Sequence, residues 1–134
     1  MFMLSMGPGR DMAFPDVCLT PVGPVPAPVP YPNMAMSAAT MPVAFKVLVE
    51  CTPGVNMMSK GLVSLGDQPG VLMGAVSHMN SGQTSYMVGC FTIIVGGAPA
   101  QRMTSVTAQN CLVAAPNTVG ACLCPSQATV LSLG

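Results

Sequence analysis

The sequence predicts an all-β fold of short strands and hairpins with little helix, and three observations support this prediction. Glycine and proline, 14 of each in 134 residues, interrupt nearly every apolar stretch. Two stretches, 45–50 and 85–95, are rich in the β-branched and aromatic residues that favour strands. Gly96 and Gly97 close the second stretch, and adjacent glycines are typical of a hairpin turn. We therefore expect many tight turns, in a chain whose length suits one domain.

Charged side chains are scarce in this sequence. Four Lys and Arg balance four Asp and Glu, so 6% of the residues are charged, against a usual value of roughly 25%. A neutral chain lacks the basic patch that nucleic-acid binding needs, and its 51% apolar content excludes disorder. The sequence has thirteen methionines, which adapt to irregular contacts, and too few charged residues to cover its surface. Because large exposed apolar patches usually mark an interface, the protein is expected to function bound to a partner.

No segment has the pattern of a transmembrane helix or a secretory signal. The longest apolar stretch, 87–100, is broken by three glycines and a proline, and it is shorter than the about 20 residues that span a bilayer. The apolar start of the chain is followed, not preceded, by Arg10. We expect a cytoplasmic protein without stable membrane insertion, whose six cysteines are thiols or metal ligands.

The first half of the chain divides into six segments. Residues 1–13 are expected to form a flexible leader, followed by a single β domain over 14–134. The prolines of 15–32 exclude a helix and a central strand and predict extended, polyproline-like chain. Residues 34–41 support a single helical turn. A strand is expected at 45–50, a turn at 51–54 and a return strand at 55–59.

The second half has the strongest strand signal. Residues 74–82 have the composition of an exposed loop, and 85–95 that of a strand. After the Gly96-Gly97 turn, a return strand is expected within 98–107. Short strands or turns follow at 111–115 and 121–125, and 128–133 is a closing strand.

A faint internal repeat relates the two hairpins. Residues 47–59 can be laid on 93–105 at an offset of 46. The identical pairs are Val49/Val95, Pro53/Pro99, Met57/Met103 and Ser59/Ser105. Both copies have a strand, a proline-containing turn and a strand, which is consistent with a small β domain made of repeated hairpins.

Two strings carry a resemblance to a known family. The first is Phe-Pro-Asp-Val-Cys-Leu-Thr-Pro at 14–21, continued by Val-Pro-Tyr-Pro-Asn-Met-Ala at 29–35. The second is the hairpin from Val95 to Asn110, with Gly-Gly-Ala-Pro and Thr-Ala-Gln-Asn. The first resembles the "D-V-C-x-T-P … P-x-P-Y-P-N-x-A" signature of PAAR-like proteins, and the second resembles their "G-G-x-P-x … T-x-x-N" hairpin. The resemblance covers about residues 14–110.

The resemblance implies a small cone-shaped β protein at the tip of a type VI secretion (contractile injection) spike. The broad base of such a protein caps a trimeric VgrG-type spike in a 1:3 ratio, and its point leads the spike through a target membrane to deliver secreted effectors. This chain is expected to lack a toxin extension, because it stops at Gly134. It would be made in the bacterial cytoplasm and then injected with the spike.

The cysteines raise the question of a metal. PAAR-like proteins often bind a metal near the point through His and Cys, and zinc takes four N or S ligands. The preferred ligands here are Cys111, Cys122 and Cys124, with Cys18 or His78 as the fourth, and the clustering of these cysteines favours a point near 111–125. The zinc would be structural. In the alternative, all six cysteines are buried apolar residues, the role assigned to Cys51 and Cys90.

The ionisable residues and motifs of this sequence do not predict catalysis. Asp67 and His78 could in principle support a Cys or Ser nucleophile, but the sequence has no nucleophile elbow, HExxH, P-loop or GxGxxG motif. We therefore expect no enzyme and no catalytic residues. The alternative functions are a small cytoplasmic cysteine-rich metal-binding or redox protein, and a membrane-associated protein.

Overall fold

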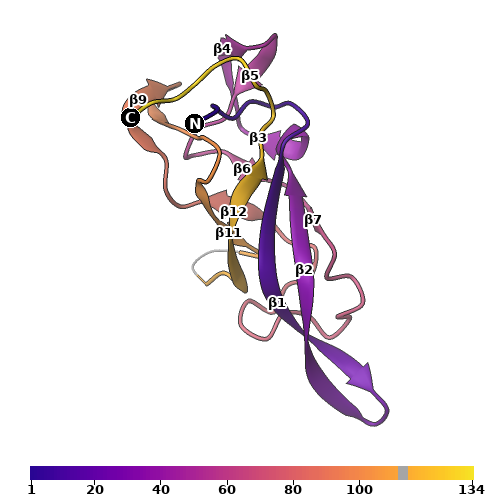
Figure 1. Cartoon of the computed structure of the whole chain (residues 1–134). Coiled ribbons are helices and arrows are strands. Elements are labelled where there is room, and N and C mark those ends of the chain that lie inside the picture. The colour runs from indigo at the N-terminus through magenta and orange to yellow at the C-terminus, as the bar shows by residue number, and fades with distance from the viewer. Residues whose placement is uncertain (112–114) are drawn as a thin grey trace.

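The structure, a computed structural model, describes residues 1–111 and 115–134 and confirms the all-β prediction (Figure 1). A 3-10 turn, η1 (Ser37–Ala39), lies where a single helical turn was expected. In chain order the strands are β1 (Arg10–Val22), β2 (Val25–Met36), β3 (Thr40–Met41), β4 (Ala44–Val49), β5 (Thr52–Gly54), β6 (Lys60–Gly61), β7 (Ser64–Leu65), β8 (Thr84–Tyr86), β9 (Cys90–Val95), β10 (Ala98–Ala100), β11 (Val106–Gln109) and β12 (Thr118–Cys124).

The molecule is elongated, with a broad end and a narrow end (Figure 1). Eight strands form one sheet in the order β3-β6-β8-β11-β12-β1-β2-β7. Two small hairpins, β4–β5 and β9–β10, lie apart from this sheet at the broad end, together with both chain termini. The long β1–β2 hairpin runs from the body to the narrow end, where its turn is the farthest projection. The narrow end is therefore the β1–β2 turn, and not the segment 111–125 that the cysteine clustering favoured.

The tip of the β1–β2 hairpin is a two-residue turn. Val22 pairs with Val25 across Gly23 and Pro24, and Gly23 has a φ of 66°. A positive φ at the first central residue is typical of a type II′ turn, which needs glycine there, and proline at the second central position has a suitable fixed φ. The local sequence thus determines where the chain reverses.

The proline-rich segment is extended, as expected, but it forms a paired β-hairpin and not polyproline-like chain. β12 pairs with β1 only over Arg10–Ala13, a stretch without proline. On the same side, Cys18 bridges to Gly74 and Leu19 hydrogen-bonds to Met73, again at positions that are not proline. Pro15 lies where the β1–β2 register shifts, between Ala13 and Asp16. The prolines therefore occupy positions where no ladder hydrogen bond is required, so a long strand can contain them although they have no N–H to donate.

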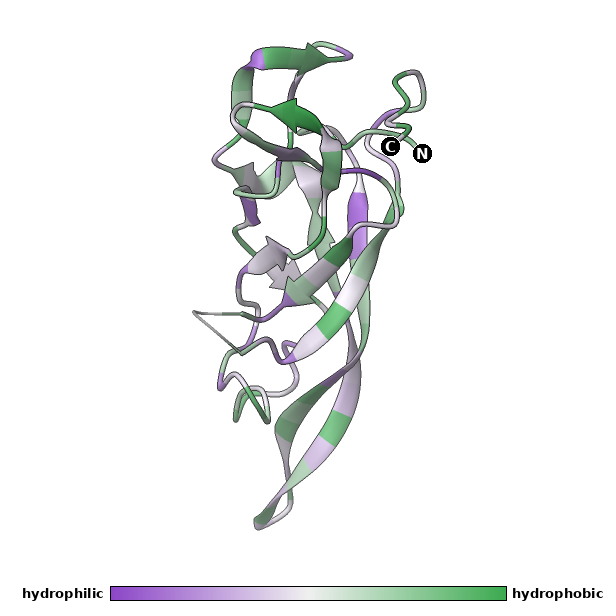
Figure 2. Ribbon diagram, turned by 90° about the vertical axis from the view of Figure 1, so that its left-hand side faces the viewer, coloured by the Kyte–Doolittle hydropathy of each residue, from purple (hydrophilic) through white to green (hydrophobic). Residues whose placement is uncertain are grey.

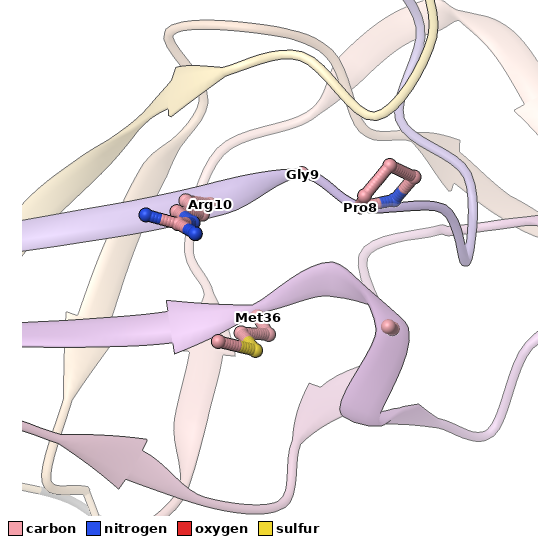
Figure 3. Close-up of a pocket in the computed structure, with 5 residues that line it drawn as sticks. Pro8, Gly9, Arg10 and Met36 are labelled. Atoms are coloured by element: carbon pink, nitrogen blue, oxygen red, sulfur yellow. The ribbon is translucent and has the colours of Figure 1, made fainter.

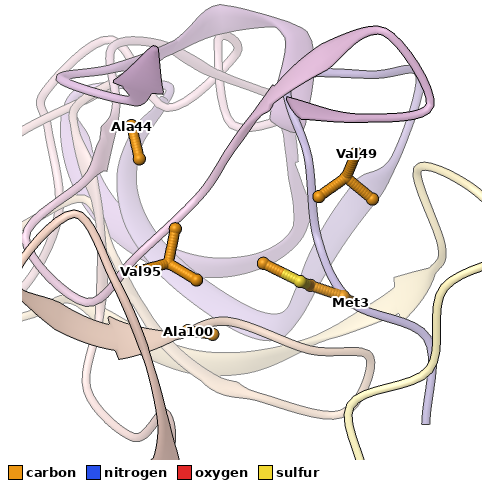
Figure 4. Close-up of a cluster of buried hydrophobic side chains, with 5 residues drawn as sticks. All are labelled: Met3, Ala44, Val49, Val95 and Ala100. Carbon is orange, nitrogen blue, oxygen red and sulfur yellow. The ribbon is translucent and has the colours of Figure 1, made fainter. Parts of the chain in front are cut away.

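Two clusters of buried side chains form the core at the broad end and below it. The first contains Met3, Ala44, Val49, Val95 and Ala100, so it joins the N-terminal segment to both small hairpins (Figure 4). The second cluster contains Leu4, Val43, Val55, Tyr86 and Cys122.

The first residues are part of the domain. We expected a flexible leader over 1–13, but Leu4 is fully buried and β1 begins at Arg10. The first hairpin also differs from its prediction. Its turn is Glu50-Cys51, and the residues 52–54 that carried the Pro-Gly turn signal form β5.

Candidate docking face

The two small hairpins are structural repeats with the predicted offset of 46. β4 and β9 begin at Ala44 and Cys90, and β5 and β10 begin at Thr52 and Ala98, so both strands of each hairpin keep this spacing. Leu48 pairs with Pro53, and Ile94 pairs with Pro99 at the same positions. The weak sequence repeat is therefore a real repeat of structure.

Both turns reverse the chain through two successive residues with positive φ. These are Gly96 and Gly97 in the second hairpin, with φ of 63° and 87°, and Glu50 and Cys51 in the first, with φ of 50° and 62°. Positive φ at both central residues is typical of a type I′ turn, which matches the twist of the flanking strands. The first hairpin makes this turn without glycine, so sequence reasoning placed it elsewhere.

A third, equivalent unit is built from the two ends of the chain. Met3 donates its backbone N–H to Val130 at 3.0 Å, and Phe2 forms a β-bridge with Leu131. The N-terminal segment thus takes the place of β5 or β10, and the C-terminal segment takes the place of β4 or β9. Sequence reasoning missed this unit, because its halves lie at opposite ends of the chain.

Backbone hydrogen bonds close the three units into a ring. Leu4 donates to the carbonyl of Gln101 at 2.8 Å, Gln101 to Val55 at 3.1 Å, and Val55 back to Leu4 at 3.1 Å. All three residues are fully buried. Because each donates to the next and the last returns to the first, the three positions are equivalent around a pseudo-threefold axis.

A second set of three hydrogen bonds flanks this ring, with donors two residues after and acceptors two residues before its members, and it runs round the three units in the opposite sense. Its hydrogen bonds are Met6 N–H to Pro53 O (2.9 Å), Met57 N–H to Pro99 O (2.9 Å) and Met103 N–H to Phe2 O (2.8 Å). Three isolated β-bridges follow the same rotation and join Ser5 to Gly54, Asn56 to Ala100 and Met3 to Arg102. The broad end is therefore a small trefoil of three hairpins.

The trefoil exposes a large aliphatic side chain at one equivalent position of each unit. Phe2, Pro53 and Pro99 are equivalent, so their strand partners are equivalent too. These partners are Leu131, Leu48 and Ile94, with exposed fractions of 53%, 64% and 60%. Hydrophobic colouring marks the small hairpins in Figure 2. Exposed apolar side chains gathered in this way are typical of an interaction site.

The rest of the face is mainly apolar. Phe45 and Phe91, 46 positions apart in β4 and β9, have the same exposed fraction of 67%. The charged residues Lys46 and Glu50 belong to the first hairpin, and Glu50 accepts a hydrogen bond from Thr129 at 2.6 Å. The exposed face of the trefoil is thus mainly apolar, with Lys46 and Glu50 as the charged residues of its first hairpin.

A buried polar cluster fixes the root of the long hairpin. Asp16 on β1 accepts hydrogen bonds from the side-chain amides of Asn33 on β2 (2.9 Å), Asn110 after β11 (2.6 Å) and Asn117. The Asn110 amide nitrogen also donates to Asp67 at 2.5 Å. Asp16 and Asn33 belong to the first family string, and Asn110 ends the second, so the two strings meet in space. Their likeness was visible in the sequence, but the cluster was not.

Asn110 is oriented by contacts on its other side. Its carbonyl oxygen accepts from the backbone N–H of Gly82 at 2.6 Å and the hydroxyl of Ser64 at 3.1 Å. The amide nitrogen must therefore face the two carboxylates. Burial raises the pKa of Asp16, and the Asp67 charge raises it further, although the hydrogen bond from Asn117 opposes both.

The structure does not bring the four preferred zinc ligands together. Cys122 lies opposite Asp11 in the β1–β12 pair, and Cys18 is seven residues further along β1. At about 3.3 Å per strand residue, more than 20 Å separate the two, whereas zinc holds sulfur at about 2.3 Å. Cys124 is exposed and lies opposite Arg10.

The remaining candidates lie elsewhere. Cys111 follows β11 and donates its backbone N–H to Gln83 at 3.0 Å, and His78 is exposed in the loop whose Gly74 bridges to Cys18. Over residues 1–111 and 115–134, no three His, Cys, Asp or Glu side chains are grouped so that they could hold a metal ion. The residues described do not fit the zinc that the family resemblance implied.

The thiol environments also disfavour metal binding, which requires thiolate. Burial raises the pKa of Cys18 to about 12, with Asp16 and Asp67 adding to it. Burial and the neighbouring Asp11 raise the pKa of Cys122. Asp11 is itself almost fully buried, and burial raises its pKa although Tyr86 donates a hydrogen bond to it at 2.9 Å.

The other candidate groups do not form a recognisable active centre. The Asp67 carboxylate accepts from Asn110 and from the backbone of Ser81, while His78 is exposed. Two grooves lie beside Arg10. One, of about 140 Å³, runs between the chain before β1 and the end of β2 (Figure 3), and the other, of about 90 Å³, lies against Leu65. Pockets that enclose small molecules usually measure about 300–1,000 Å³.

In the part of the chain that the structure describes, no helix is long and apolar enough to cross a membrane.

Comparisons with known proteins identify the family of this chain. Searches of curated proteins and of solved structures gave no match. The family model of the Toxin PAAR-like domain matches residues 9–120, which include the β1–β2 hairpin and both small hairpins. The resemblance seen in the sequence is thereby confirmed, and this chain belongs to the Toxin PAAR-like domain family.

Proposed function

We propose that this protein is the structural tip of a contractile injection spike, and that its broad end caps a trimeric VgrG-type protein with one chain per trimer. The observation that carries the proposal is the ring of Leu4, Val55 and Gln101, which makes three equivalent units from one chain. A trimer offers three identical surfaces at its end, and a single chain meets all three alike only if it repeats its own contact surface three times.

The exposed side chains suit this role. Leu48, Ile94 and Leu131 occur once in each unit, so each would contact a different subunit of the trimer. Their burial would supply the apolar core of the interface, while Lys46 and Glu50 belong to one unit only and would break the threefold equivalence. Family membership supports a role in toxin delivery systems, and the narrow hairpin end would then lead the spike through a membrane to deliver effectors.

Replacing the three equivalent residues tests the proposal. In the variant Leu48→Lys/Ile94→Lys/Leu131→Lys, we expect folding to be retained and affinity for the trimeric spike protein to fall at least about a hundredfold, because three apolar contacts become desolvated charges. The matched control is Val71→Lys/Leu72→Lys/Leu123→Lys, three exposed apolar residues outside the trefoil. Unchanged binding by the first variant, or equal loss in both, would contradict the proposed face.

A further inference from the structure

The narrow end of the molecule is an exposed hairpin tip without charge. All residues from Pro21 to Pro26 are exposed, and Val22 and Val25 have exposed fractions of 59% and 62%. The sequence carries no formal charge between Asp16 and Lys46. The tip therefore presents apolar atoms to its surroundings with no charged group to hold water.

The outer edge of this hairpin also lacks backbone donors. Val25 and Val22 flank the turn as a hydrogen-bonded pair, so alternate residues of β2, Val25, Ala27 and Val29, direct their N–H groups toward β1. The positions between them face outward, and these are Pro26, Pro28, Pro30 and Pro32. Beyond the turn, β7 covers β2 only at Met34 and Ala35. The free edge thus offers carbonyl acceptors but no N–H.

The inner edge of the same hairpin is already satisfied. Leu19 on β1 donates its backbone N–H to Met73 at 2.8 Å and accepts from Leu72 at 3.1 Å. Pro21, the next outward position of β1, has no N–H. The projecting part of the hairpin is therefore almost free of unsatisfied backbone donors on both edges.

The missing charges and backbone donors favour a lipid bilayer over an added β-strand as the partner of the tip. A strand that added to the free edge would need donors from β2 as well as acceptors, so the prolines disfavour strand addition. A lipid bilayer instead penalises charges and unpaired N–H groups; the tip carries no charge, and in its turn only the N–H of Gly23 is left unpaired. The outward carbonyls still need water, which limits the tip to the interfacial layer of the bilayer.

We propose that the β1–β2 turn is a lipid-binding element, which inserts Val22 and Val25 reversibly into the interface of a bilayer. This inference does not depend on the capped spike, because the hairpin projects from the isolated chain. It differs from simple puncture in predicting an equilibrium affinity for lipid without applied force.

The absence of tryptophan from the sequence makes a direct test possible. In the full chain, Val25→Trp places a sole indole at the tip, and Leu123→Trp places one on the exposed face of β12 as the control. Each is mixed with neutral phosphatidylcholine vesicles whose acyl chains carry bromine. We expect quenching and a shift of emission to shorter wavelength for the tip reporter, and neither for the control.

Substitutions of Val22 test how vesicle partition depends on the apolar area of the tip. In the Val25→Trp chain, Val22→Ser should weaken vesicle partition about tenfold and Val22→Leu should strengthen it, because partition follows the apolar area inserted. Adding anionic lipid should change partition by less than about twofold, since the tip carries no charge to be screened.

Three results would overturn the proposal. An unquenched tip reporter at saturating lipid would mean that the hairpin contacts protein or water only. Equal quenching of both reporters would mean general adsorption of the apolar surface. Binding that requires anionic lipid would assign the contact to charged residues elsewhere. Because no spike protein is present, each result is independent of the capping experiment.

Discussion

Asn110 donates its side-chain amide to Asp16 at 2.6 Å, across 94 positions of the sequence. The same nitrogen donates to Asp67 at 2.5 Å, so one amide separates two buried carboxylates. This contact ties the root of the long hairpin to the end of β11 and to the loop after β7. The projecting hairpin is thus anchored by polar contacts at the level where the apolar core ends.

Removing Asn110 should therefore destabilise the protein strongly. We expect Asn110→Ala to lower the free energy of unfolding by about 3 kcal/mol, because two buried carboxylates and the Gly82 N–H lose a partner. Urea unfolding followed by circular dichroism measures the change. Asn80→Ala, which removes bonds to two uncharged carbonyls, is the control and should lose about 1 kcal/mol. Equal losses would show that the carboxylates do not need the amide.

The two type I′ turns give opposite expectations for glycine. Cys51 and Gly97 are equivalent, and both have positive φ. We expect Cys51→Gly to stabilise the protein by about 1 kcal/mol and Gly97→Ala to destabilise it by a similar amount, because a side chain is strained in this conformation. A Cβ at Gly97 would meet no atom within 4 Å, so the loss would report backbone strain alone. Thermal unfolding checks both, and a destabilised Cys51→Gly would contradict the turn assignment.

Asp11 should make the protein more stable in mild acid. Burial raises its pKa above the ordinary 3.8, so the folded chain binds this proton more tightly than the unfolded chain does. Stability then increases as the pH falls from above the raised pKa toward 3.8, and the gain levels off below that value. The groups facing the carboxyl are the Tyr86 hydroxyl and the Cys122 thiol.

Unfolding midpoints from pH 7 to pH 4 measure this effect. Asp11→Asn should reduce the gain on acidification, because the titrating group is gone. Tyr86→Phe should enlarge it, because the hydroxyl that favours the ionised carboxyl is lost. A wild-type protein whose stability depends on pH in the same way as that of Asp11→Asn would refute this role of Asp11.

The cysteines should divide by reactivity. Cys51 and Cys124 are exposed, whereas Cys18 is fully buried with a pKa of about 12. Because the thiolate is the reactive form, Cys18 should modify at least about a thousandfold more slowly than Cys51 at pH 8. Mass spectrometry of the chain after brief alkylation locates the modified residues. Rapid modification of Cys18 in the folded protein would mean that the root of the hairpin opens.

The repeat of the two small hairpins was predictable because both copies are continuous in sequence. The offset of 46, found from four identical positions, is the spacing of β4 to β9 and of β5 to β10. The position of the first turn was not predictable, because Pro53-Gly54 has a stronger turn signal than Glu50-Cys51. The packing of three units against one another overrides that local preference.

The third unit and the polar cluster depend on distant contacts. The closing strand expected at 128–133 contains Leu131, but no local pattern identifies Phe2 as its partner, because the two residues are brought together only when the ring closes. Asp16, Asn33 and Asn110 were visible only through the resemblance of their strings to PAAR-like proteins. Cys111, Cys122 and Cys124 were chosen as zinc ligands by their closeness in sequence, with Cys18 or His78 as the fourth. Strand geometry separates Cys18 from Cys122, because Cys122 pairs with Asp11 on β1, seven residues before Cys18.

The stoichiometry of the complex with a trimeric spike protein tests the central claim most directly. The two proteins are co-expressed, purified together and weighed intact by native mass spectrometry. Three equivalent units in one chain predict a single chain per trimer, with no species carrying two or three. A complex with three chains per trimer, or a chain that remains monomeric beside the spike, would contradict the trefoil as a cap.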